Sequence, residues 1–169
     1  MKDQITGRPR TVSGTAADPG RVATTPLAPT VLLADPDPES RAMMRDALLE
    51  GTRPCQLRTV ETGKELEGYL RDPNPANPKP ALVLIDLDLP PEGGVETLIK
   101  LKRDADLRHI PVVILTSRPE PTSTAAAYEA GANTVIPKPA TFIALVRLVK
   151  VLTAYWLEAA ALPPQQDLP

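Results

Sequence analysis

Four polar residues of this chain stand where short apolar runs end, and they carry the groups that could do chemistry. Asp35 and Asp86 each follow such a run, and Thr116 and Lys138 follow two later ones. Buried apolar segments that end in unpaired charges would be costly, so these groups need partners. Two carboxylates, a hydroxyl and an ammonium are therefore expected to converge.

These groups together suit an anion that is transferred with the help of a hard cation. Carboxylate and carbonyl oxygens are the ligands of Mg²⁺, which keeps several waters and rarely needs more than two protein carboxylates. An ammonium and a hydroxyl opposite them would hold phosphoryl oxygens, because phosphoryl transfer relies on positioning and charge neutralisation. No histidine or cysteine nucleophile is near, so a carboxylate must take the group.

The elements that must position these residues alternate along the chain from residue 30 onward. The expected strands cover residues 30–34, 55–60, 81–85, 112–115 and 133–136, and the expected helices cover residues 38–50, 62–70, 95–103, 122–130 and 141–159. In the first helix Ala42, Met43, Ala47 and Leu48 are expected near one face. Proline-rich residues 73–80 are expected to form a loop.

Two of the expected strands, residues 81–85 and 112–115, are apolar at every position. This pattern is typical of strands that are buried on both faces. Five strands alternating with five helices predict an α/β fold, with an open, mostly parallel sheet covered on both faces. Ligands of such sheets gather outside the carboxyl ends of the strands, where Asp35, Asp86 and Thr116 are expected.

Three motifs give the chain a resemblance to a known family. They are residues 82–90 (LVLIDLDLP) with Gly94, residues 113–117 (VILTS) and residues 136–139 (IPKP). In this order they resemble the receiver domain of two-component response regulators, over about residues 31–152. The resemblance implies a flavodoxin-like (βα)5 fold whose parallel strands are ordered 2-1-3-4-5. It also implies a stand-alone signalling protein.

The resemblance also implies a role for each site residue. Asp86 would be the phosphoacceptor, Thr116 would hydrogen-bond the phosphoryl group, and Lys138 would pair with it. Asp35, Asp86 and the main-chain carbonyl of Asp88 would bind Mg²⁺. Such a protein is not an enzyme with a separate substrate: it accepts a phosphoryl group from a partner histidine kinase and takes part in its own phosphotransfer and dephosphorylation.

A second resemblance is narrower. Residues 106–111 (DLRHIP) and 152–156 (LTAYW) are similar to single-domain receivers that pair with bacteriophytochrome histidine kinases. This similarity covers the C-terminal half of the chain, and it implies a bacteriophytochrome as the partner kinase.

The chain departs from the receiver pattern after the first strand. Receivers usually carry two adjacent acids there, the second of which binds the metal directly, whereas this chain has Asp35-Pro36. Asp37 could replace the missing ligand, but Asp37 before Pro38 is typical of a helix N-cap, and we favour the cap. We therefore expect a weakened Mg²⁺ site.

A second departure concerns the last strand. Val135 stands where many receivers have a tyrosine or phenylalanine that turns inward when the hydroxyl equivalent to Thr116 engages phosphate. Its absence puts this aromatic switch in doubt, although phosphorylation does not require it.

The composition limits the partners and the compartment. Nineteen basic residues against 21 acidic ones leave no field that would drive binding to nucleic acid or membrane, and no apolar segment reaches spanning length. We expect a cytoplasmic protein. Residues 1–28 are expected to be a disordered leader, residues 29–158 the receiver domain and residues 159–169 a tail.

The last helix carries more apolar residues than one sheet-facing stripe needs. The excess indicates either a well-buried helix or a partner surface. We favour a homodimer whose interface includes Tyr155 and Trp156, because exposed apolar patches and clustered aromatics mark interfaces.

Two other functions compete with the phosphoacceptor. In the first, Pro36 replaces a metal-binding acid and so impairs Mg²⁺ binding. The chain is then a degenerate receiver that acts as a protein-interaction module with weak phosphorylation or none. In the second, the same architecture binds flavin. This second alternative lacks a phosphate-cradling glycine-rich loop after the first strand and has only five aromatic residues for stacking.

Overall fold

The computed structural model describes residues 28–51 and 53–162, which fold as alternating strands and helices. The strands are β1 (Thr30–Ala34), β2 (Gln56–Val60), β3 (Leu82–Asp86), β4 (Val112–Thr116) and β5 (Thr134–Pro137). The helices are α1 (Pro38–Leu49), α2 (Gly63–Arg71), α3 (Gly94–Arg103), α4 (Pro121–Glu129) and α5 (Phe142–Ala154), and α5 continues into the π-helical turn η1 (Tyr155–Ala159).

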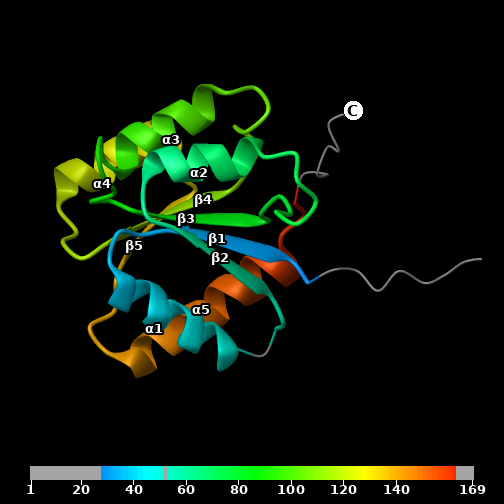
Figure 1. Cartoon of the computed structure of the whole chain (residues 1–169). Helices are drawn as coiled ribbons and strands as arrows, with labels where there is room; N and C mark the ends of the chain where they lie inside the picture. The colour runs from blue at the N-terminus through cyan, green and yellow to red at the C-terminus, as the bar shows by residue number, and fades with distance from the viewer. Residues whose placement is uncertain (1–27, 52, 163–169) are drawn as a thin grey trace, which may run out of the picture.

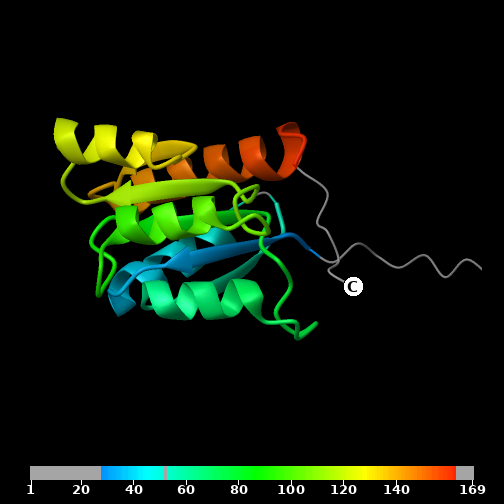
Figure 2. The ribbon, with the colours of Figure 1, turned by 90° about the horizontal axis from the view of Figure 1, so that it is seen from above.

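The five strands form one parallel sheet in the order β2-β1-β3-β4-β5. This confirms the fold and the strand order that the receiver resemblance implies. Helices α2, α3 and α4 cover one face of the sheet, and α1 and α5 cover the other (Figure 1). Seen from above, the helices run alongside the strands (Figure 2). The strand order reverses between β1 and β3, where ligands of open parallel sheets bind.

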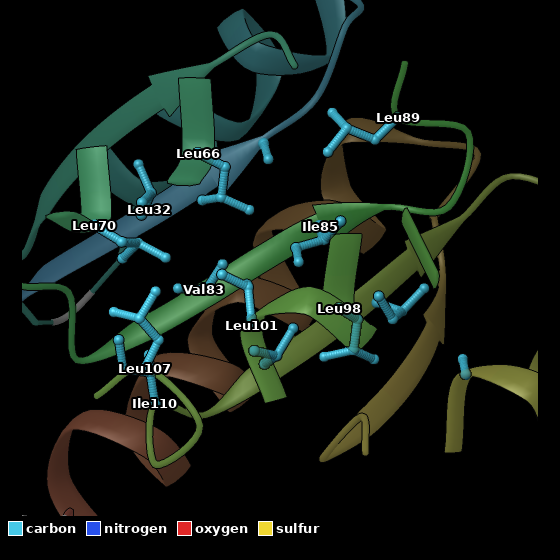
Figure 3. Close-up of a cluster of buried hydrophobic side chains, with 14 residues drawn as sticks. Leu32, Leu66, Leu70, Val83, Ile85, Leu89, Leu98, Leu101, Leu107 and Ile110 are labelled. Carbon is cyan, nitrogen blue, oxygen red and sulfur yellow. The ribbon is translucent and has the colours of Figure 1, made fainter. Parts of the chain in front are cut away.

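The core has one apolar layer on each side of the sheet, because successive side chains of a strand point to opposite faces. In β1, Leu32 packs with the α2–α3–α4 layer, and its neighbour Leu33 packs with the α1–α5 layer. β3 repeats the pattern with Val83 and Leu84. Figure 3 shows the α2–α3–α4 layer, with Leu32 among its labelled side chains. Double burial explains why β3 and β4 are apolar up to their last residues.

The buried face of α1 differs from the expected one at two positions, because Ala42 and Met43 are both exposed. Met44 is 4% exposed and packs under the sheet, whereas Met43 is 46% exposed. The helical repeat explains why Met44 is buried and Met43 is not, because Met44, Ala47 and Leu48 follow the three- and four-residue spacing of one helix face. Met43 lies about 100° away around the axis.

The ends of the chain bear on two further expectations. The predicted leader (residues 1–28) and tail (residues 159–169) lie for the most part outside the described residues, so both stay predictions. Within the described residues, no helix has the length and apolar character needed to cross a membrane.

Candidate functional site

The carboxyl edge of the sheet brings together the residues that end its strands. Asp35 follows β1, Asp86 ends β3, Thr116 ends β4, and Lys138 follows β5. Asp35 is 0% exposed, Asp86 6% and Thr116 2%. Groups this polar are buried only when they have partners, so the contacts among them define the site.

Lys138 connects the two carboxylates. Its Nζ lies 2.7 Å from Oδ2 of Asp35 and also contacts Oδ2 of Asp86. Its backbone N–H donates to the carbonyl of Thr116 at 2.7 Å, which ties the residue to the end of β4. Burial by itself would lower the pKa of Lys138, but the hydrogen bonds to Asp35 and Asp86 outweigh it and raise the pKa above its ordinary value.

Asp35 is held by groups on both sides of its carboxylate. Oδ1 accepts the backbone N–H of Asp37 at 2.9 Å, and Oδ2 accepts the Ser40 hydroxyl at 2.6 Å as well as the Lys138 ammonium. The guanidinium of Arg41 donates to the main-chain oxygen of Asp35 at 2.8 Å. Both carboxylate oxygens of Asp35 thus accept hydrogen bonds within the chain.

Asp86 is oriented by the turn that follows it. Its Oδ1 accepts the backbone N–H of Asp88 at 2.7 Å, so Oδ2 is left for Lys138. The turn packs closely on α3, because a Cβ at Gly94 would meet the main-chain oxygen of Asp86 and lie 3.0 Å from Cα of Leu87. Gly93 has a φ of 105°, which L side chains rarely adopt. The two glycines let α3 begin directly against the site.

Thr116 lies at the same edge with its hydroxyl engaged locally. Oγ1 accepts the backbone N–H of Arg118 at 3.1 Å. The guanidinium of Arg118 lies 3.8 Å from Oδ2 of Asp88, and both side chains are exposed. An exposed pair at this distance adds little stability, but it shows that the loops after β3 and β4 are neighbours. The Thr116 hydroxyl makes no hydrogen bond to Asp86 among the described contacts.

Asp37 caps α1. Its side chain accepts the N–H of Glu39 at 3.0 Å, and Pro38 occupies the first turn, as the sequence predicted. An open cleft of about 340 Å³ lies beside the site. Its rim includes Asp37, Ser117 and Lys138, and its apolar wall includes Met44 and Leu145.

The donors at this edge of the sheet are of the kind that bind a hard divalent cation. The described residues contain no cluster of three or more acidic, histidine or cysteine side chains that could hold a metal ion. Both carboxylate oxygens of Asp35 already accept hydrogen bonds, and Pro36 supplies no carboxylate. Asp86 and a main-chain carbonyl still meet the minimum of Mg²⁺, which uses one or two carboxylates and keeps its waters.

Tyr155 and Trp156 lie far from this site. They belong to η1, and with Thr134, the first residue of β5, they line a hollow at the opposite edge of the sheet. Their rings meet edge to face, with centroids 5.0 Å apart and planes at 86°. Tyr155 is 57% exposed, whereas Trp156 packs partly into the α1–α5 layer.

Comparison with known proteins identifies the family. The model of the response regulator receiver domain family matches residues 31–150, which include all four strand-end residues. The chain belongs to this family. It is therefore a receiver domain of two-component signalling.

Three of the similar proteins and structures are matched over nearly their whole length. Response regulator Rcp1 of Synechocystis sp. (strain PCC 6803) is 30% identical over 135 residues, which cover 79% of this chain and 92% of that protein. The phosphorylated cyanobacterial phytochrome response regulator RcpA, known from a crystal structure, has 33% sequence identity to this chain and a TM-score of 0.74. The match covers 80% of this chain and 99% of RcpA. The Mn²⁺-bound form of Rcp1 has 28% identity and a TM-score of 0.71, over 80% and 99% of the two chains.

Two residues of the site were not found from the sequence. Ser40 contacts Asp35 and Lys138, and Arg41 joins the Asp35 main chain to Glu61 through its guanidinium. The only signal for either was their position in the first turn of a helix that begins beside Asp35. Which side of that turn faces the site depends on the rotation of α1.

Proposed function

We propose that this receiver accepts a phosphoryl group on Asp86 from the phosphohistidine of a partner histidine kinase. The observation that carries the proposal is the Lys138 ammonium, which contacts both Asp35 and Asp86 at the carboxyl edge of the sheet. A carboxylate beside a fixed cation suits attack at phosphorus, because the cation neutralises charge on the phosphoryl oxygens.

The transfer exchanges one bond to phosphorus for another. A carboxylate oxygen of Asp86 bonds to phosphorus while the bond between phosphorus and the donor's histidine nitrogen breaks, and the electron pair leaves with that nitrogen. The product is an acyl phosphate on Asp86. Thr116 and Lys138 stand at the same edge and would contact its peripheral oxygens. The receiver is then a phosphoacceptor that takes part in its own phosphotransfer and dephosphorylation, not an enzyme with a separate substrate.

A divalent cation, Mg²⁺, would be held by Asp86 and the main-chain carbonyl of Asp88, with Asp35 as the nearest further carboxylate. When bound, it would neutralise charge on the phosphoryl oxygens. Because Pro36 stands where receivers usually carry a ligand, and because the Asp35 oxygens already accept hydrogen bonds, we propose that the metal is held weakly.

Partners follow from the relatives and from the exposed surface. RcpA is a phytochrome response regulator, which supports a bacteriophytochrome histidine kinase as the phosphodonor. We propose that both proteins act in the cytoplasm. The described residues form a receiver domain, so we propose that the signal leaves through protein contacts. Exposed apolar residues along α5 and η1 support a homodimer that uses Tyr155 and Trp156.

Phosphorylation can be tested with acetyl phosphate and Mg²⁺. We expect the native chain to gain one hydroxylamine-labile phosphoryl group by intact mass, and Asp86→Asn to gain none. Asp106→Asn is the matched control, because Asp106 is an exposed residue of the loop before β4 and should label like the native chain. Equal labelling of native protein and Asp86→Asn would refute the proposal.

The rival function, a degenerate receiver, is favoured by one observation: Pro36 in place of an acid. Calorimetric titration with Mg²⁺ separates the two. We expect weak binding by the native chain and binding at least about tenfold tighter by Pro36→Asp, because added ligand charge raises affinity. Pro36→Ala controls for loss of the proline itself. Absence of both Mg²⁺ binding and labelling in the native chain would favour the rival.

A further inference from the structure

Ser40 completes a closed triangle of polar atoms beside Asp86. Its Oγ lies 2.6 Å from Oδ2 of Asp35 and 3.2 Å from Nζ of Lys138. The same Asp35 oxygen is 2.7 Å from that Nζ, so all three atoms are in mutual contact. A serine can join such a triangle because its hydroxyl both donates and accepts.

The direction of each hydrogen bond follows from the charges. The Asp35 carboxylate only accepts, so the Ser40 hydroxyl donates its proton to Asp35. The Lys138 ammonium only donates, so it directs one N–H to the Ser40 oxygen. Its other two N–H groups have Asp35 and Asp86 as acceptors. Three donors therefore meet three acceptors, and this match sets the rotation of the ammonium about its Cε–Nζ bond.

The start of α1 holds the hydroxyl in place. Ser40 is the third residue of the helix, and its first turn is capped by Asp37 and begins with Pro38. The N–H of Asp37 also donates to Oδ1 of Asp35, so the helix start and the carboxylate are joined on both sides. Proline fixes its own φ, which stiffens this connection.

We propose that Ser40 is a positioning residue for phosphoryl transfer, whose hydroxyl couples Asp35 to Lys138 and aims the ammonium at Asp86. This inference rests on the proposed function and names a residue that acts through Lys138. Without the hydroxyl, the ammonium keeps only Asp35 and Asp86 as acceptors, and its third N–H loses its fixed direction. The cation is then no longer preorganised for the phosphoryl oxygens.

The first test compares phosphorylation kinetics of Ser40→Ala and Ser40→Thr with the native chain. We expect Ser40→Ala to lower the rate constant at saturating acetyl phosphate about tenfold, the scale of one hydrogen bond to a charged group. The donor concentration for half-maximal rate should change less than about twofold, because donor binding does not use the hydroxyl. Ser40→Thr, which keeps a hydroxyl, should recover most of the rate.

The second test observes the Lys138 ammonium directly by NMR. In ¹⁵N-lysine-labelled protein, an ammonium held by three acceptors should exchange its protons slowly enough to give a resolved Nζ proton signal, assigned by its loss in Lys138→Arg. We expect that signal to broaden in Ser40→Ala and to persist in Ser40→Thr. Ser123→Ala is the matched control, because Ser123 lies in the first turn of α4 and its hydroxyl bonds only to a local carbonyl in the described contacts.

The outcomes separate this inference from the function on which it rests. No labelling of the native chain would remove the proposed function. Native labelling with an equal rate and an unchanged Nζ signal in Ser40→Ala would overturn the role of Ser40 alone. A Ser40→Thr variant that is as slow as Ser40→Ala, while both unfold at the native temperature, would also overturn it.

Discussion

At the scale of single residues, the site depends on the balance between its carboxylates and its one ammonium. Two buried carboxylates, Asp35 and Asp86, share one ammonium, that of Lys138. Backbone N–H groups of Asp37 and Asp88 supply further positive dipoles to the two acids. The cluster keeps an excess of negative charge, which a receiver can use to attract a cation near the phosphoacceptor.

The charge on Lys138 should make stability depend on pH at the alkaline end. Its pKa is raised above the ordinary value of 10.5 in the folded chain, so folding favours the protonated form. The contribution is therefore fully present below pH 10.5 and is lost as the pH rises through the folded pKa. We expect Lys138→Met to lower the unfolding temperature by about 3–10 °C at pH 8. This difference from the native chain should shrink above pH 10.5, measured by circular dichroism.

A difference between the two proteins that stays constant up to the most alkaline pH tested would contradict this. The comparison with Lys138→Met cancels the titration of the other lysines and tyrosines, which both proteins share. Native unfolding curves alone would not isolate this one ammonium.

At the scale of elements, the close packing of α3 on the end of β3 places Asp86. Gly94 is the first residue of α3, and its N–H donates to the carbonyl of Leu87 at 2.9 Å. A Cβ there would press on the main-chain oxygen of Asp86, which cannot move without shifting the strand end. The glycine thus connects a helix start with the position of the phosphoacceptor.

Gly94→Ala should destabilise the receiver and slow its phosphorylation together. We expect a loss of about 1–3 kcal/mol, the usual cost of overpacking, measured by urea unfolding. Labelling by acetyl phosphate should slow because Asp86 is displaced. Gly68→Ala is the control: a Cβ at Gly68 in α2 has nothing within 4 Å, so this variant should be neutral or gain up to about 1 kcal/mol. Equal stability of the two variants would show that the contact at Gly94 relaxes freely.

The elements themselves were predictable because their signals are local. Double burial makes β3 and β4 apolar up to their last residues, and this pattern predicted the parallel sheet and its carboxyl edge, where Asp86 and Thr116 lie. The rotation of α1 was not predictable in detail, because two adjacent methionines fit the apolar pattern almost equally. The same uncertainty prevented the contacts of Ser40 from being predicted, because they depend on which side of the first turn faces Lys138.

At the scale of the whole molecule, one surface stands out. Four large apolar side chains of α5 and η1 are exposed, and three of them follow four- and eight-residue spacing: Ile143 at 67%, Val151 at 66% and Tyr155 at 57%. This spacing puts them along one side of the helix, with Arg147 between the first two. The sequence predicted an excess of apolar residues here, but whether a second chain covers them depends on contacts that a single chain does not contain.

If that surface is a homodimer interface, charge placed on it should separate the protomers. We expect the native receiver to sediment as a dimer at about 0.1 mM, and Val151→Lys/Tyr155→Lys to weaken the dimer at least about tenfold, because a symmetric interface brings each new lysine near its copies. Leu49→Lys is the control, since Leu49 is 80% exposed at the end of α1, and it should leave the dimer intact. Both lysine substitutions replace exposed side chains, so the unfolding temperature should stay within a few degrees of the native value, about 3 °C. A native chain that is monomeric at that concentration would contradict the homodimer, and a double variant as dimeric as the native chain would place the interface elsewhere.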